Sequence, residues 1–201
     1  MKIEVDNITE YQKLIIVKGL YDYQYLMNNW ENVSDDDFYK VYYNFYLSAR
    51  GGIMRRDGNK VPYYKKLRDI SQNEDFVELL NQLKDEMQSN SYEFSLVSKL
   101  LHTRNPVMPI YDSKVREYLS KNEEVEFWWY RNKDMYGNSA PRGTIEIEKI
   151  KHDWQELCKW YLSFQESVRG KKWIEWFDIN FPEFKNISNV KKIDFIIFAT
   201  N

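Results

Sequence analysis

The chain has 201 residues, of which 43% are hydrophobic, 30% charged and 17% aromatic, and its formal net charge is -2 at pH 7. With only 7 Gly and 5 Pro, this composition excludes a disordered chain and predicts one globular domain over 1–201, or two small lobes. The single cysteine, Cys158, excludes an internal disulfide, and two histidines disfavour a protein zinc site. The chain shows no signal-like N-terminus and no apolar run of membrane length, so we expect a cytoplasmic monomer without a cofactor.

The predicted elements are helices along most of the chain. Apolar residues recur at helical spacing over about 8–30, and again over about 35–48, where Gly51-Gly52 follows as a stop signal. The aromatic-flanked stretch 122–144 contains glycines and a proline and is predicted to be a loop. Further helices are expected over about 64–71, 74–88, 145–166, 171–179 and 187–198, although the last could also pass for a strand. The fold class is therefore all-α.

The segment Ser95–Leu119 is predicted to form a helix, a proline-containing turn and a second helix. Apolar residues mark one face of the first helix, and Lys99 lies on the opposite, polar stripe. The first helix ends at Asn105-Pro106, because a residue before proline avoids the α region, and Asp112 or Ser113 caps the second helix. Taken alone, a solvated lysine and a plain helix cap are the expected roles, but the pattern places Lys99 and Asp112 across one turn.

This segment resembles the helix-hairpin-helix DNA glycosylases, in particular bacterial 8-oxoguanine DNA glycosylase-like proteins. The shared pattern is an aromatic residue, a lysine with two apolar residues and a histidine, a short loop, an apolar pair, and an aspartate before a valine-containing helix. Residues 190–195 are similar, more loosely, to a closing helix of such proteins. The resemblance implies two helical lobes with the Lys/Asp segment at the cleft. The matching positions are Phe94, Lys99, Leu100, Leu101, His102, Ile110, Tyr111, Asp112 and Val115.

The resemblance implies that Lys99 is a nucleophile and Asp112 its electrostatic partner in excising a damaged or modified base from double-stranded DNA. A carboxylate stabilises the positive charge that develops at C1′, and a neutral amine can attack that carbon, with strand cleavage as a further step. The base must leave the stack, so aromatic side chains are expected at the site. The expected contacts to base or phosphate are Asn44, Arg50, His102, Arg104, Tyr111, Lys114, Arg116, Trp128 and Trp129.

Two alternatives stay open. A helical module could retain this fold and bind DNA or protein without catalysis. The stretch Gln88–Tyr92 favours that alternative, because it lacks the glycines with which the family's hairpin approaches a phosphate, and so does the slightly negative net charge. In the other alternative, the chain is a purely structural helical protein whose Lys/Asp pair is coincidental.

Overall fold

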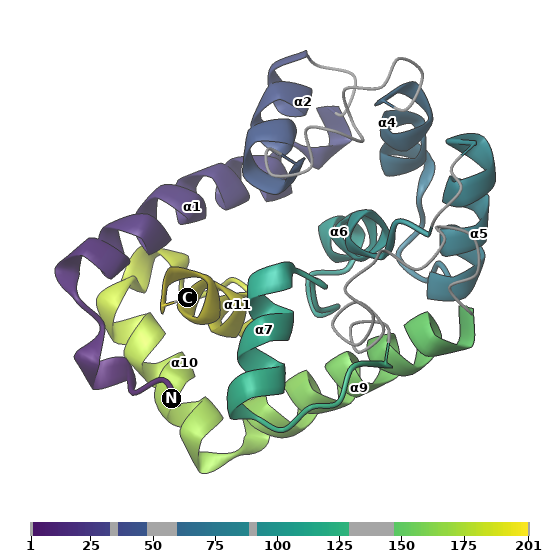
Figure 1. The fold of residues 1–201 in the computed structure, drawn as a ribbon. Helices are drawn as coiled ribbons and strands as arrows, with labels where there is room; N and C mark the ends of the chain where they lie inside the picture. Colours follow the sequence, from purple (N-terminus) through teal and green to yellow (C-terminus); the bar gives the residue numbers. More distant parts are fainter. Residues whose placement is uncertain (1, 33–35, 48–59, 89–91, 129–146, 201) are drawn as a thin grey trace.

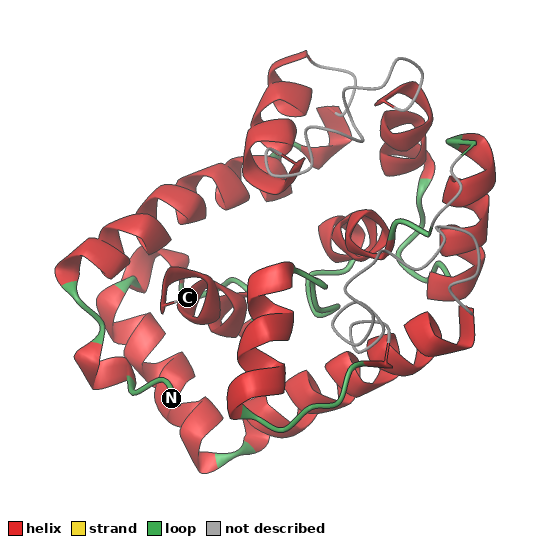
Figure 2. Ribbon diagram, viewed as in Figure 1, coloured by secondary structure: helices red, strands yellow, loops and turns green. Residues whose placement is uncertain are grey.

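The computed structural model describes residues 2–32, 36–47, 60–88, 92–128 and 147–200. Within these residues the chain is all-α and contains no strand, as the sequence predicts (Figures 1 and 2). None of the described helices is both long and apolar enough to cross a bilayer. The α-helices are α1 (Glu10–Asn28), α2 (Asp36–Tyr42), α4 (Lys60–Asp69), α5 (Phe76–Glu86), α6 (Phe94–Arg104), α7 (Ser113–Asn122), α9 (Ile147–Glu166), α10 (Val168–Asn180) and α11 (Asn189–Thr200). The shorter elements are the 3-10 turns η1 (Val5–Asn7), η2 (Trp30–Asn32) and η5 (Pro182–Phe184), and the π-helical turn η3 (Tyr43–Leu47).

Side-chain caps explain where several helices begin. Thr9 and Gln12 form a reciprocal capping box at the start of α1. The Asp75 carboxylate accepts two backbone N–H groups at the start of α5, and Ser167 caps α10. Asp112 caps α7 by accepting the N–H of Lys114, so the predicted helix boundary at Asp112 is confirmed. These caps satisfy amides that have no partner within their own helix.

Helices α6 and α11 form the centre of the molecule. Figure 1 shows both nearly end-on, with the other helices arranged around them. Residues 94–103 of α6 and 190–197 of α11 are all buried. The closing segment, for which the sequence left a helix or a strand open, is the helix α11. This helix contacts α1, α7, α9 and α10. A helix that is buried on all sides is normally apolar throughout, yet these two carry the buried charged residues Lys99, Lys191, Lys192 and Asp194.

Gly170 allows the chain to turn sharply from α9 into α10. A Cβ atom at this position would lie 1.8 Å from the carbonyl oxygen of Phe164 and 2.6 Å from its carbonyl carbon. These are backbone atoms and cannot rotate away. We therefore expect Gly170→Ala to lower the free energy of unfolding by about 3 kcal/mol, as over-packing typically does.

Urea unfolding followed by circular dichroism measures this loss. Val168→Ala is the matched control, because Val168 lies in the same turn and is 89% exposed. The control should change stability by no more than about 0.5 kcal/mol. Equal urea midpoints for Gly170→Ala and the wild-type protein would contradict a steric clash between a Cβ atom at position 170 and the Phe164 carbonyl.

Candidate functional site

A cavity of about 400 Å³ lies between α1, η3, α6, the start of α7 and α11. Its size falls in the range of roughly 300–1,000 Å³ that is usual for ligand pockets. Lys99 and Asp112 both line it, so the structure brings the two key sequence candidates to one cavity. The apolar walls include Ile15, Phe45, Ile110, Phe195 and Phe198. The charged groups that line it are Lys18, Asp22, Lys99, Asp112, Lys191 and Asp194.

A hydrogen bond next to the key pair fixes the geometry of the α6–α7 turn. The Ser98 hydroxyl accepts the backbone N–H of Tyr111 at 3.0 Å and donates to the Ser95 carbonyl at 3.1 Å. Ser98 and Tyr111 directly precede Lys99 and Asp112 in the chain. The bond therefore couples the backbones that carry the amine and the carboxylate. Lys99 itself is only 5% exposed, and Asp112 is half-buried.

His102 belongs to the interior, so the expectation that it contacts a phosphate is wrong. Its side chain is fully buried, and Nδ1 lies 2.6 Å from the carbonyl oxygen of Met108. Since a carbonyl only accepts, Nδ1 carries the proton, and Nε2 accepts from the Tyr23 hydroxyl at 3.2 Å. Burial, together with the charge of Lys191, lowers the pKa of His102 to about 3. The imidazole is thus neutral and anchors the turn to α1.

Arg104 and Tyr111 also have internal partners. The Arg104 guanidinium lies 3.2 Å from the centroid of the Trp30 ring, and its Nε donates to the Ile70 carbonyl at 2.9 Å. The Tyr111 ring is 2% exposed and stacks on Phe94 with a centroid separation of 3.7 Å. Neither residue lines the cavity. The predicted base contact of Tyr111 is therefore wrong, because its ring is packed into the core.

Of the remaining predicted contact residues, some lie at the cavity and others lie elsewhere. Asn44, in the π-helical turn η3, is exposed and lines it. Lys114 donates to the Phe198 carbonyl at 3.2 Å, which places it beside a residue of the cavity wall. The Arg116 guanidinium lies 5.9 Å from the centroid of the Tyr111 ring. Trp128 does not line the cavity but stacks on His152 in a separate groove. Arg50 and Trp129 lie outside the described residues.

Lys191 and Asp194 of α11 are charged cavity residues that sequence reasoning missed. Their side chains form a buried ion pair of 2.7 Å. Burial raises the pKa of Asp194, and Asp112 raises it further, whereas Lys191 and Lys99 lower it. Asp194 therefore interacts electrostatically with each of the other three groups. Charged residues three apart in an otherwise apolar closing helix were the signal that could have identified this pair.

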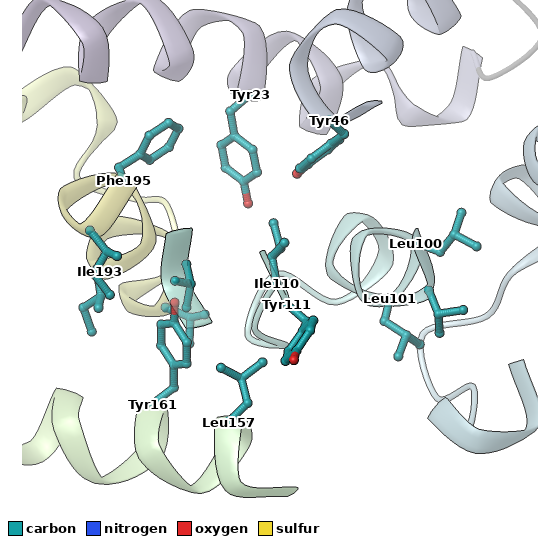
Figure 3. Packing of buried hydrophobic residues seen from close by; sticks show 14 of the residues in the cluster. Tyr23, Tyr46, Leu100, Leu101, Ile110, Tyr111, Leu157, Tyr161, Ile193 and Phe195 are labelled. Carbon is teal, nitrogen blue, oxygen red and sulfur yellow. The ribbon is translucent and has the colours of Figure 1, made fainter. Parts of the chain in front are cut away.

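Aromatic side chains surround the same region. Figure 3 shows Tyr23 and Tyr46 pointing toward the middle of the molecule from one side, with Phe195 of α11 close to them and Tyr161 rising from α9 on the opposite side. Burial, together with the negative charges of Asp194 and Asp112, raises the pKa of Tyr161 well above its ordinary value. Its hydroxyl therefore stays protonated, as a neutral group beside the charged cluster.

Comparisons with known proteins identify no relative. The chain matches no family model, and no curated protein or solved structure matches it either. The likeness of Ser95–Leu119 to helix-hairpin-helix glycosylases therefore remains an expectation drawn from its residues. The position of Lys99 and Asp112 in one cavity bears on function independently of that likeness.

The neutral state of His102 predicts a pH dependence of stability. Between the ordinary pKa of 6.5 and the folded-state value of about 3, the unfolded chain binds a proton that the folded protein does not. His102 therefore makes the free energy of unfolding fall by up to about 1.4 kcal/mol per pH unit as the pH decreases through this window. We expect His102→Gln to be less stable than wild type at pH 7.5, by about 1–3 kcal/mol, with the difference shrinking at pH 4.5.

Urea unfolding at several pH values measures how the free energy of unfolding changes with pH in wild type and in His102→Gln. Leu101→Ala is the control, because Leu101 is buried in the same helix and carries no titratable group, so its difference from wild type should stay constant across the window. A constant difference between His102→Gln and wild type across the window would contradict a neutral, buried His102.

Proposed function

We propose that this protein is a DNA N-glycosylase with lyase chemistry that removes a damaged or modified base. The observation that carries the proposal is the shared cavity: Lys99 and Asp112 line one pocket of about 400 Å³, held across a hydrogen-bonded turn. An amine and a carboxylate at one cavity, beside aromatic walls, are the groups that attack at a sugar C1′ requires.

The reaction uses the two side chains in different ways. Lys99 attacks as the neutral amine, and its nitrogen lone pair forms a bond to C1′. The glycosidic bond breaks, its electron pair leaves with the base, and the base takes up the proton that the attacking nitrogen gives up. The C1′–O4′ bond then opens, O4′ takes up a proton, and the Schiff base that results is the species that borohydride reduces. Positive charge develops on the sugar as the glycosidic bond breaks, and the Asp112 carboxylate stabilises it. The carboxylate accepts a backbone N–H at the start of α7, where the helix dipole also favours a negative charge.

The cavity walls suit a flat, uncharged base. Phe45 and Phe195 have ring centroids 6.3 Å apart at an angle of 53°, so they form a corner rather than a parallel slot. An everted base would stack on one of these faces, with Phe198, which is 45% exposed, at the cavity wall. The exposed amide of Asn44 can then donate to or accept from a base edge.

A second candidate function is a non-catalytic DNA- or protein-binding module. It is favoured by the internal roles of His102 and Arg104, which remove two of the cations expected to contact phosphates. The net charge of -2 points the same way. This candidate predicts binding without covalent chemistry, so the same experiment separates the two functions.

Borohydride trapping tests the nucleophile. We expect the wild-type protein, incubated with duplexes that carry oxidised, deaminated or alkylated bases or an abasic site, to form a covalent adduct with at least one of them. Lys99→Gln should reduce the adduct at least about 100-fold, because the attacking amine is gone. Lys192→Gln is the matched control, since Lys192 is equally buried but does not line the cavity. Binding of DNA without any adduct would favour the non-catalytic module.

Asp112→Asn tests the carboxylate separately from the fold. Asparagine caps a helix about as well as aspartate, so α7 should remain intact while the charge is lost. We expect single-turnover base release to fall about 100-fold or more, with DNA binding retained, since removing one transition-state stabilising group costs this much in other enzymes. Unchanged release would remove Asp112 from the mechanism, and thermal unfolding of the variant checks that the cap is preserved.

A further inference from the structure

The Lys191–Asp194 ion pair lies in the cavity that holds Lys99. Its Nζ–Oδ2 distance is 2.7 Å, and the two side chains are 4% and 11% exposed. A buried ion pair contributes little net stability, because the cost of removing two charges from water offsets their attraction. Stability is therefore a weak explanation for an ion pair at this position.

Aromatic rings surround the Lys191 ammonium group. The ring faces of electron-rich side chains attract a cation, and Asp194 adds a direct ion pair. The Lys191 Nζ lies 4.8–5.6 Å from the ring centroids of Phe195, Tyr23, Phe45 and Tyr46.

The charge of Lys191 acts on neighbouring groups. It contributes to the low pKa of His102, which lies in α6 one turn after Lys99. Asp194 interacts electrostatically with Lys191 and with Lys99, so both amines lie within its reach. A second cation in the same cavity disfavours protonation of an amine, which is an established way to activate a lysine.

We propose that Lys191 is a positioning residue: its ammonium, held by Asp194 and the surrounding rings, keeps the Lys99 amine unprotonated and available for attack. The inference rests on the proposed function, since it assigns the protonation state that attack by Lys99 requires. The carboxylates of Asp194 and Asp112 oppose Lys191 and limit the effect. The other titratable groups that face the cavity or its charged cluster are Lys18, Asp22 and Tyr23 of α1, Tyr46 of η3, His102 of α6, Asp112 before α7, and Tyr161 of α9.

Two variants should shift the pH midpoint for attack by Lys99 in opposite directions. Lys191→Met removes the cation, so the pH midpoint for attack should rise and the rate at pH 7 should fall about tenfold, which is one pH unit. Asp194→Asn removes the opposing anion, so the midpoint should fall and the rate at pH 7 should increase. A variant that merely loosened the cavity would lower the rate at every pH.

The neighbouring pair Lys192–Asp178 provides matched controls. Its N–O distance is 2.6 Å, and Lys192 is as buried as Lys191, but neither residue lines the cavity. Lys192→Met and Asp178→Asn should therefore leave the pH midpoint of attack unchanged. These controls distinguish the charge of Lys191 from the general effect of breaking an ion pair on α11.

A duplex with one abasic site is the probe, because its C1′ is an aldehyde that a placed amine attacks whatever base the protein recognises. Initial rates of adduct formation are measured from pH 5.5 to 9.5, with samples quenched into borohydride at one fixed pH. We expect the rate to reach a plateau within this range, with a wild-type midpoint below the ordinary lysine pKa of about 10.4. This measurement needs no variant, so it tests the inference even if Lys191→Met or Asp194→Asn does not fold.

The outcomes separate the two proposals. If wild type forms no adduct, the proposed function fails and this inference fails with it. If wild type forms an adduct that Lys99→Gln abolishes, the function is supported. Within that result, midpoints that do not move, or that move in the same direction for Lys191→Met and Asp194→Asn, overturn the role of Lys191. A wild-type rate that is still rising at pH 9.5, with no plateau, overturns it as well.

Discussion

A charged side chain can leave water only if the protein supplies partners for it, and this constraint shapes the centre of the molecule. Three lysines and an aspartate are buried in α6 and α11, where apolar residues would pack more simply. Lys191 pairs with Asp194, and Lys192 pairs with Asp178. The aromatic rings around Lys191 complete its surroundings. Because these partners come from several helices, the charged centre fixes how the helices are placed around it.

The α6–α7 turn converts this arrangement into a site. His102 bonds to Met108 on one side of the turn and to Tyr23 of α1 on the other, while Ser98 holds the N–H of Tyr111. Ser188 adds a bond to the Pro106 carbonyl at 2.6 Å. Lys99 and Asp112 are therefore presented by backbone that is tied down at several points. Preorganisation of this kind would favour the proposed attack at C1′, since small displacements are costly in rate.

The sequence predicted the helices well but the exposure of their faces poorly. Apolar spacing, the proline turn and the Asp112 cap were all local signals, and the structure confirms the elements they predicted. The spacing of α6 indicated one apolar face and one polar stripe, yet both are buried, because α1 and α11 cover the stripe. That cover comes from residues far away in the chain. No local pattern reports it, so His102 and Tyr111 were assigned to a surface they do not reach.

The cavity is built from residues between Ile15 and Phe198, so its walls come from nearly the full length of the described chain. Contacts between such distant segments require the longest loop closures and form slowly compared with local helix contacts. The individual helices can form early, but the pocket exists only once α11 has docked against α1. An incompletely synthesised or partly unfolded chain therefore lacks the pocket. Its lysines then remain apart in solvent, because the helices that bring Lys99 and Lys191 to one cavity have not yet docked.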